Sequence, residues 1–245
     1  LGYLADERVL RQGPVPEDQT LKELARRAFE GMDPDLLGEL RTELRRTARA
    51  LAALHMSGAT YERAVAWTDE LAETRDVLDR LTLTVPGLRA AGEPMLRRLE
   101  AFDIAVPADP AVSAHHDFRP AQVLLGPGAV AFIDFDGAAM AEPGLDLGRF
   151  CGKLRDIGVT ALSATPTGYR ADLLQERLEL LDEFCGLVVD EYLVHAPVTR
   201  ERVLLWETID LLTALQHTWS KVRLLRVEPR LAILLHQLRT ATLTS

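Results

Sequence analysis

The spacing of leucine along most of this chain limits its possible folds more than any other feature of the sequence. Leu36, Leu40 and Leu44, for example, fall near one face of a helix predicted over residues 35–56. The chain has 245 residues, which is enough for one large domain or two small ones. Similar periodicity predicts further helices over residues 20–30, 61–83, 93–102, 146–156, 169–194, 199–225 and 228–242.

The middle of the chain interrupts this helical pattern with two short apolar runs. Residues 122–125 and 130–135 are separated by Gly-Pro-Gly, which predicts a β-hairpin. Residues 8–16 are typical of a short strand that runs into a proline-rich connection. Helices on both sides of one small hairpin predict an α+β fold that is mostly α.

Composition and charge narrow the class of protein. The formal net charge is −9 and no basic cluster is free of neighbouring acids, so we expect no nucleic-acid partner. No apolar run approaches the roughly 18 residues of a membrane span, and the start shows no signal-peptide pattern. We therefore expect no membrane association and a cytoplasmic location, with Cys151 and Cys185 as buried free thiols. The oligomeric state cannot be read from the sequence.

The segment 114–150 carries acids that helical or strand periodicity does not require. Asp117 falls in a predicted loop, Asp134 near the end of the second predicted strand and Asp146 at the start of a predicted helix. Gln122 follows Asp117 by five residues. Phosphoryl transfer needs a carboxylate to align the attacking hydroxyl and oxygen ligands to hold Mg²⁺. Because the predicted hairpin turns the chain back, Asp134 is expected to approach Asp117 and Gln122.

The order and spacing of these residues resemble a known family. HHDFRPAQVLL, FIDFD and EPGLDLG are similar to the H-x-D-x-x-x-x-N, I-D-[WF]-[ED] and D-L-[AG] series of the aminoglycoside phosphotransferase and choline kinase-like family. LAALH at residues 51–55 also resembles the A-L-x-x-L-H helix of that family. The resemblance covers nearly the whole chain and is sharpest in residues 114–150. It implies the larger lobe of a protein-kinase-like fold, with the hairpin carrying the metal-binding aspartate.

The resemblance also implies a reaction and a role for each matching residue. The reaction is transfer of the γ-phosphate of ATP or GTP to a hydroxyl group of a small molecule, with Mg²⁺ as cofactor. Asp117 would orient the substrate hydroxyl and accept its proton. Asp134 would ligate Mg²⁺, and Gln122 would take the place of the metal-binding Asn. His115 and Asp146 would brace the catalytic loop.

Gln122 is the first departure from the family pattern. Glutamine keeps the amide oxygen but is one methylene longer than asparagine, and the chain contains no Asn that could replace it. Some relatives, among them maltokinase-like ones, also carry Gln at this position, and we therefore expect Gln122 to be a metal ligand.

The second departure concerns the small, strand-rich lobe of the family, which carries a Gly-rich loop and a strand lysine. Most of this lobe has no counterpart in the sequence. Residues 1–17 resemble only its last strand and the hinge, where adenine would lie beside the backbone around Gly13 and Val15. Residues 18–245 would form the helical catalytic lobe. Lys22 lies beyond the hinge and cannot replace the strand lysine. Because the first residue is leucine, we expect a fragment of a longer chain that binds ATP poorly by itself.

Two other interpretations remain open. A non-catalytic kinase-like protein that binds a ligand or a partner would explain Gln122 and the absent strand lysine. A helical interaction domain would make the aspartates incidental, and it predicts that Asp117 and Asp134 lie far apart. Among the other polar residues, we expect His116 to be an exposed loop residue. We expect Glu201, Glu207 and Asp210 to lie on a solvated helix face rather than in a substrate cleft. The sequence does not identify the phosphate acceptor.

Overall fold

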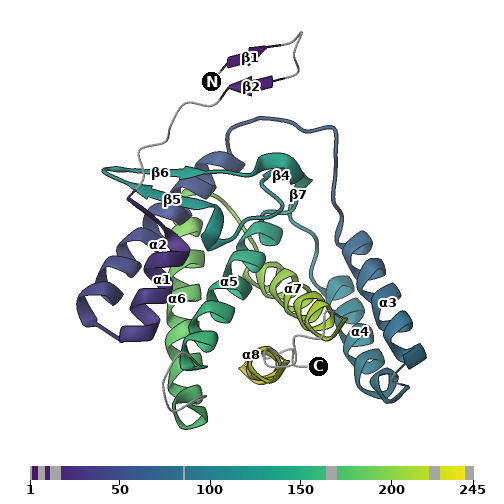
Figure 1. Cartoon of the computed structure of the whole chain (residues 1–245). Coiled ribbons are helices and arrows are strands. Elements are labelled where there is room, and N and C mark those ends of the chain that lie inside the picture. The colour runs from purple at the N-terminus through teal and green to yellow at the C-terminus, as the bar shows by residue number, and fades with distance from the viewer. Residues whose placement is uncertain are drawn as a thin grey trace.

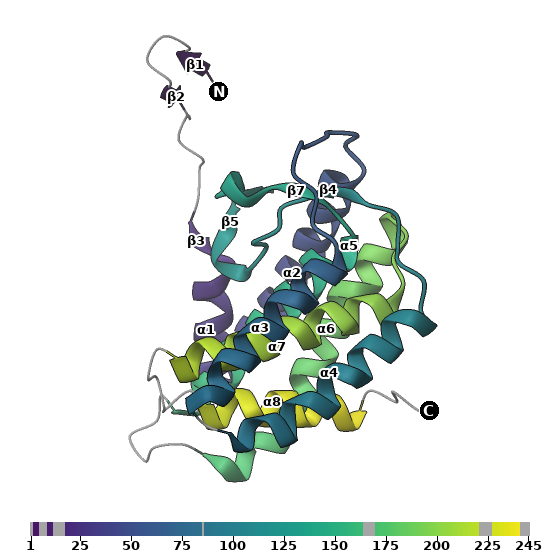
Figure 2. The same cartoon turned by 90° about the vertical axis from the view of Figure 1, so that its right-hand side faces the viewer.

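The computed structural model describes residues 2–4, 9–11, 18–84, 86–163, 170–220 and 227–240. Long helices make up most of the body, and short strands lie together near one end of it (Figures 1 and 2). This arrangement confirms the α+β, mostly helical fold. The helices are α1 (Leu21–Gly31), α2 (Pro34–His55), α3 (Trp67–Thr84), α4 (Gly87–Ala105), α5 (Pro143–Thr160), α6 (Leu174–His195), α7 (Arg200–Ser220) and α8 (Val227–Thr240).

Local capping residues explain where the first two helices begin. Thr20 caps α1 in a capping box, since its hydroxyl accepts from the Glu23 backbone while the Glu23 carboxylate accepts from the Thr20 N–H. Asp33 caps α2 and is followed by Pro34, whose fixed φ suits the first helical turn. Both helices therefore lie within a few residues of their predicted ranges.

The α3 helix begins later than its periodicity predicts. The prediction placed its start at residue 61, whereas the helix begins at Trp67. Ala64 instead forms an isolated bridge with Met140, and the Val65 N–H donates to the Met140 carbonyl over 2.9 Å. The residues before α3 are thus held in an extended form by a strand that lies far away in the sequence.

Short strands, most of them not predicted, frame the central loops. Antiparallel pairing joins β3 to β5 and β5 to β6, which is the predicted hairpin, and it joins β4 to β7. The β4–β7 pair places the start of β4 beside the end of β7, which leads into α5. The strands are β1 (Gly2–Leu4), β2 (Val9–Arg11), β3 (Gln19–Thr20), β4 (Val112–Ala114), β5 (Val123–Gly126), β6 (Ala129–Phe132) and β7 (Ala139–Ala141).

The strand predicted near the N-terminus is observed at Val9–Arg11, where β2 pairs with β1 in antiparallel fashion. This hairpin lies apart from the helices in both views (Figures 1 and 2). Gly13 and Val15, the expected adenine contacts, lie outside the described residues. The division of the chain after residue 17 stays a prediction.

The α5 helix is the centre of the packing. It contacts α1, α6, α7 and α8, and most of its residues are buried. Cys151 of α5 and Cys185 of α6 are buried free thiols, as predicted. Trp206 is buried in the apolar cluster between α3, α4 and α7. No described helix is both long and apolar enough to cross a bilayer.

The close approach of α5 to α7 depends on Gly148. A Cβ at this position would overlap the Glu207 backbone N and lie 2.8 Å from the Val203 carbonyl oxygen. Because both contacts are to backbone, the two helices must separate to accept a side chain. We expect Gly148→Ala to lower the free energy of unfolding by at least ~1–3 kcal/mol, measured by urea denaturation.

Gly186→Ala in α6 is the matched control. A Cβ there meets no atom within 4 Å, so the change should raise stability by about 0.5–1 kcal/mol through helix propensity. Equal effects of the two substitutions would contradict the close helix contact.

Candidate active site

Asp146, in the first turn of α5, holds the loop that follows β4 in place through hydrogen bonds. Its side chain is fully buried, and its two oxygens accept the backbone N–H groups of His115 and His116 over 2.7 and 2.8 Å. His55, at the end of α2, lies 3.0 Å from the same carboxylate through Nε2. The other ring nitrogen of His55 contacts the Tyr192 hydroxyl at 2.7 Å. One carboxylate thus connects α2, α5 and α6 with the loop.

Hydrogen bonding sets the charge state of this carboxylate. Burial by itself would raise the pKa of Asp146, but the hydrogen bonds from His55 and the His115 backbone outweigh it and lower the pKa. Burial and the nearby Asp146 charge raise the pKa of Tyr192, so its phenol stays protonated. Asp146 is therefore an anion held by donors from three directions.

His115 connects this loop with the segment that follows β6. Its Nε2 lies 2.8 Å from the Ile133 carbonyl, to which it must donate because a carbonyl only accepts. Its ring packs against Phe118 and Phe135, with centroid separations of 5.7 and 4.5 Å. Because the ring is fully buried, His115 holds the two segments together.

Asp134 and Gln122 meet at the base of the β5–β6 hairpin. Gln122 immediately precedes β5, and its backbone carbonyl accepts a hydrogen bond from the Ile133 N–H over 3.1 Å. Asp134 lies two residues beyond the end of β6 rather than within the strand, because it adopts the left-handed conformation (φ 70°) that turns the chain. Its Oδ2 accepts from Gln122 Nε2 over 2.6 Å.

This pair matches the ligand preference of Mg²⁺, which takes one or two protein carboxylates and otherwise water and phosphate oxygens. Gln122 presents its NH₂ group to Asp134, so its amide must turn over before both side chains offer oxygen to one ion. Among the described residues, no group of three or more His, Cys, Asp or Glu side chains could hold a metal. A metal here would accordingly need water or phosphate oxygens as further ligands.

Asp117 lies on the same loop, between the residues held by Asp146 and Gln122. It is partly exposed and pairs with Arg119 over 2.9 Å. No hydrogen bond joins its side chain to Asp134 or Gln122, both of which the structure describes. The structure thus brings Gln122 to Asp134, and brings His115 and Asp146 to the loop, while the contact of Asp117 is with Arg119.

A charged network beside the loop was not foreseen. Arg149 of α5 donates to the His116 carbonyl and pairs with Asp210 of α7 over 3.2 Å. Lys153 also reaches Asp210, at 2.6 Å, and Glu70 of α3 lies 3.8 Å from both Arg149 and His116. The spacing of Arg149 and Lys153, one helical turn apart after the Asp-Leu-Gly motif, was the available signal.

Two expectations about these polar residues were wrong. The His116 side chain is only 16% exposed, because Glu70 and Gly137 lie against it. Glu207 and Asp210 lie on a buried rather than a solvated face of α7. Burial raises the pKa of Glu207 against the opposing effect of Arg155, which lies 2.6 Å away.

Known proteins share both the sequence pattern and the fold. The profile of the Phosphotransferase enzyme family matches residues 1–184. A glucosamine kinase from Streptacidiphilus jiangxiensis is 28% identical over 174 residues, which are 66% of this chain and 36% of that protein. A glucosamine kinase structure superposes with a TM-score of 0.66 at 19% identity, covering 89% of this chain and 57% of the other. A choline/ethanolamine kinase family protein from Mesorhizobium loti superposes with a TM-score of 0.64 at 15% identity, covering 100% of this chain and 74% of the other.

The solved structures define the class of fold, which is a protein-kinase-like C-lobe. Since the family profile covers most of the sequence, the chain belongs to the phosphotransferase enzyme family, and the predicted resemblance to aminoglycoside phosphotransferases and choline kinases is confirmed. The chain spans 36% of the length of the curated glucosamine kinase.

The Asp146 anion makes a pH-dependent contribution to stability. Its folded pKa is lowered, so the contribution is complete above the unfolded pKa of about 3.9 and is lost as pH falls through the folded pKa. Asp146→Asn places an NH₂ group against N–H donors. We expect a loss of at least ~2 kcal/mol in the free energy of unfolding at pH 7.

Urea denaturation between pH 7 and pH 3 measures this effect, and the deficit of Asp146→Asn should shrink below about pH 4. The exposed Asp190 provides the control Asp190→Asn, which should stay within about 0.5 kcal/mol of the wild type at every pH. A deficit that is independent of pH would show that the Asp146 charge does not stabilise the fold.

Proposed function

We propose that the full-length protein transfers the γ-phosphate of ATP or GTP to a hydroxyl group of a small molecule. The observation that carries the proposal is the Gln122–Asp134 contact at the end of a loop that Asp146 fixes, on the catalytic-lobe fold of a phosphotransferase family. A solved relative contains glucosamine, ADP and inorganic phosphate. That relative supports nucleotide use and a hydroxyl-bearing acceptor here.

In this proposal the chain supplies a base and a metal site. Asp117 orients the acceptor hydroxyl and takes its proton, and its partial exposure leaves it open to a ligand. Asp134 and Gln122 hold Mg²⁺, which when bound would offset the negative charge of the phosphate oxygens. His115 and Asp146 act on the loop backbone and keep Asp117 in place.

The rest of the nucleotide site stays a prediction. Residues 1–17 would contain the last strand of a smaller lobe and the hinge that follows it. Adenine would contact the backbone of this hinge around Gly13 and Val15. Residues 18–245 would form the catalytic lobe. A cytoplasmic location also stays a prediction.

Replacing Asp117 tests the proposed base. We expect Asp117→Ala in the full-length protein to lower kcat by ~10²–10⁴-fold, the usual contribution of a positioned acid or base. A coupled assay of nucleoside diphosphate release in the presence of acceptor hydroxyl compounds measures this. Asp190→Ala removes an exposed acid of α6 and should leave kcat unchanged. Equal rates for wild type and Asp117→Ala would remove Asp117 from the mechanism.

Replacing Gln122 tests the proposed metal site. Gln122→Ala removes the amide oxygen, and we expect the Mg²⁺ concentration for half-maximal activity to rise by about tenfold or more, the cost of one charge-assisted contact. Calorimetric titration of the wild type and of Gln122→Ala with Mn²⁺ and ADP compares metal binding in the two proteins without turnover. Nucleotide binding without any phosphate transfer in the wild type would favour the non-catalytic interpretation.

A further inference from the structure

A cavity of about 490 Å³ lies between α1, α5, α8 and the turn Pro120–Gln122. Cavities of this size hold small organic ligands in many proteins. The turn is part of the loop that connects Asp117 with Gln122, so the cavity adjoins the candidate active site. None of the roles described above uses it.

The lining of this cavity is cationic, although the chain as a whole carries a net charge of −9. Among the described residues, the acids that also line it are Glu30 and Asp156. Lysine is rare in this sequence, which contains only Lys22, Lys153 and Lys221, and two of the three are in this lining. The cations that line the cavity are Lys22, Arg26, Arg119, Lys153 and Arg230.

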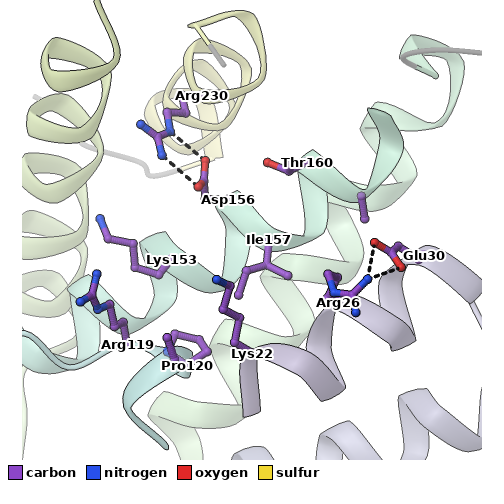
Figure 3. A pocket seen from close by; sticks show the side chains of 12 residues that line it. Lys22, Arg26, Glu30, Arg119, Pro120, Lys153, Asp156, Ile157, Thr160 and Arg230 are labelled. Carbon is purple, nitrogen blue, oxygen red and sulfur yellow. Dashed lines mark hydrogen bonds and ion pairs between the residues drawn. The ribbon is translucent and has the colours of Figure 1, made fainter. Parts of the chain in front are cut away.

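Ion pairs within the lining neutralise two of the cations. Arg26 pairs with Glu30 over 3.0 Å, and Arg230 holds Asp156 with two hydrogen bonds of 2.8 and 3.0 Å (Figure 3). Both acids of the lining are thereby used. The other three cations, which come from α1, the loop and α5, therefore have no acid within the cavity lining.

These three cations differ in how firmly they are held. Lys22 forms no ion pair or hydrogen bond with any residue that the structure describes. Within the described part of the chain, Arg119 pairs only with Asp117. Both side chains are about 40% exposed, and exposed pairs contribute little. The Arg119 Nε is buried and has no acceptor among those same residues. Lys153 is bound to Asp210, outside the lining. Figure 3 shows the three side chains entering the same space.

We propose that this cavity binds an oxyanion, a phosphate or a carboxylate, carried by the molecule whose hydroxyl is phosphorylated. The acceptor assignment depends on the proposed function, whereas the binding of the anion does not. The guanidinium of Arg119 suits bidentate contact with either oxyanion, and Lys22 adds a mobile ammonium. Lys153 adds a third positive charge, and the same charges repel an acceptor with an ammonium group at this position.

The place of Arg119 in the chain connects the cavity to the reaction. Arg119 is two residues from Asp117 and pairs with its carboxylate. An oxyanion in the cavity offers Arg119 a second partner and releases Asp117 toward a hydroxyl of the same ligand. The geometry thus favours an anionic acceptor such as a sugar phosphate or a sugar acid.

Calorimetric titration of the full-length protein with glucose 6-phosphate and with glucose, without nucleotide, tests the inference. The two sugars differ only in the phosphate group, and we expect glucose 6-phosphate to bind at least about tenfold more tightly than glucose at low salt. Lys22→Gln should weaken its binding several-fold. Arg27→Gln, which removes an exposed cation of the same helix outside the cavity, should leave it unchanged. Equal binding of the two sugars, or equal effects of the two substitutions, would overturn the proposal.

Saturating ADP distinguishes the two sources of phosphate. Binding of glucose 6-phosphate that persists with ADP supports an acceptor site, whereas displacement by ADP assigns the cavity to nucleotide phosphates and overturns the acceptor role. Asp117→Ala separates the two proposals, because it should lower kcat by ~10²–10⁴-fold while glucose 6-phosphate still binds. Anion binding that requires Lys22, in a protein without kinase activity, would overturn the proposed function and leave the anion site intact.

Discussion

The buried carboxylate of Asp146 is the contact on which the rest of this structure depends. It receives two backbone N–H groups of the loop after β4 and a ring nitrogen of His55, and His55 in turn reaches Tyr192. A buried anion is stable only when donors surround it, so its neighbours must keep their positions. The loop consequently takes its conformation from the helical body.

The candidate site is built on this fixed loop from short-range contacts. His115 attaches the loop to the segment after β6, and the hairpin register sets Gln122 beside Asp134. Asp117 remains partly exposed between these two anchors. A rigid loop that presents one accessible carboxylate suits a reaction in which the protein mainly positions charged groups.

Local patterns explain which elements the sequence predicted. The leucine periodicity of α2 and α6 reports one buried face per helix, and this face can be read from the residues themselves. The strands β4 and β7 have only three residues each, too few for a period, and they form because they pair across 24 intervening residues. The late start of α3 has the same cause, since Ala64 pairs with a distant strand.

By itself, the sequence determined the helices, the hairpin, the family motifs and the candidate residues, since spacing along the chain carries this information. Tertiary structure alone decided which polar groups meet. It buried Glu207 and Asp210 beside cations of α5, and it gathered Lys22, Arg119 and Lys153 around one cavity. The reason is physical: contacts between side chains that are 30 to 130 positions apart depend on how helices pack, and no local period encodes that packing.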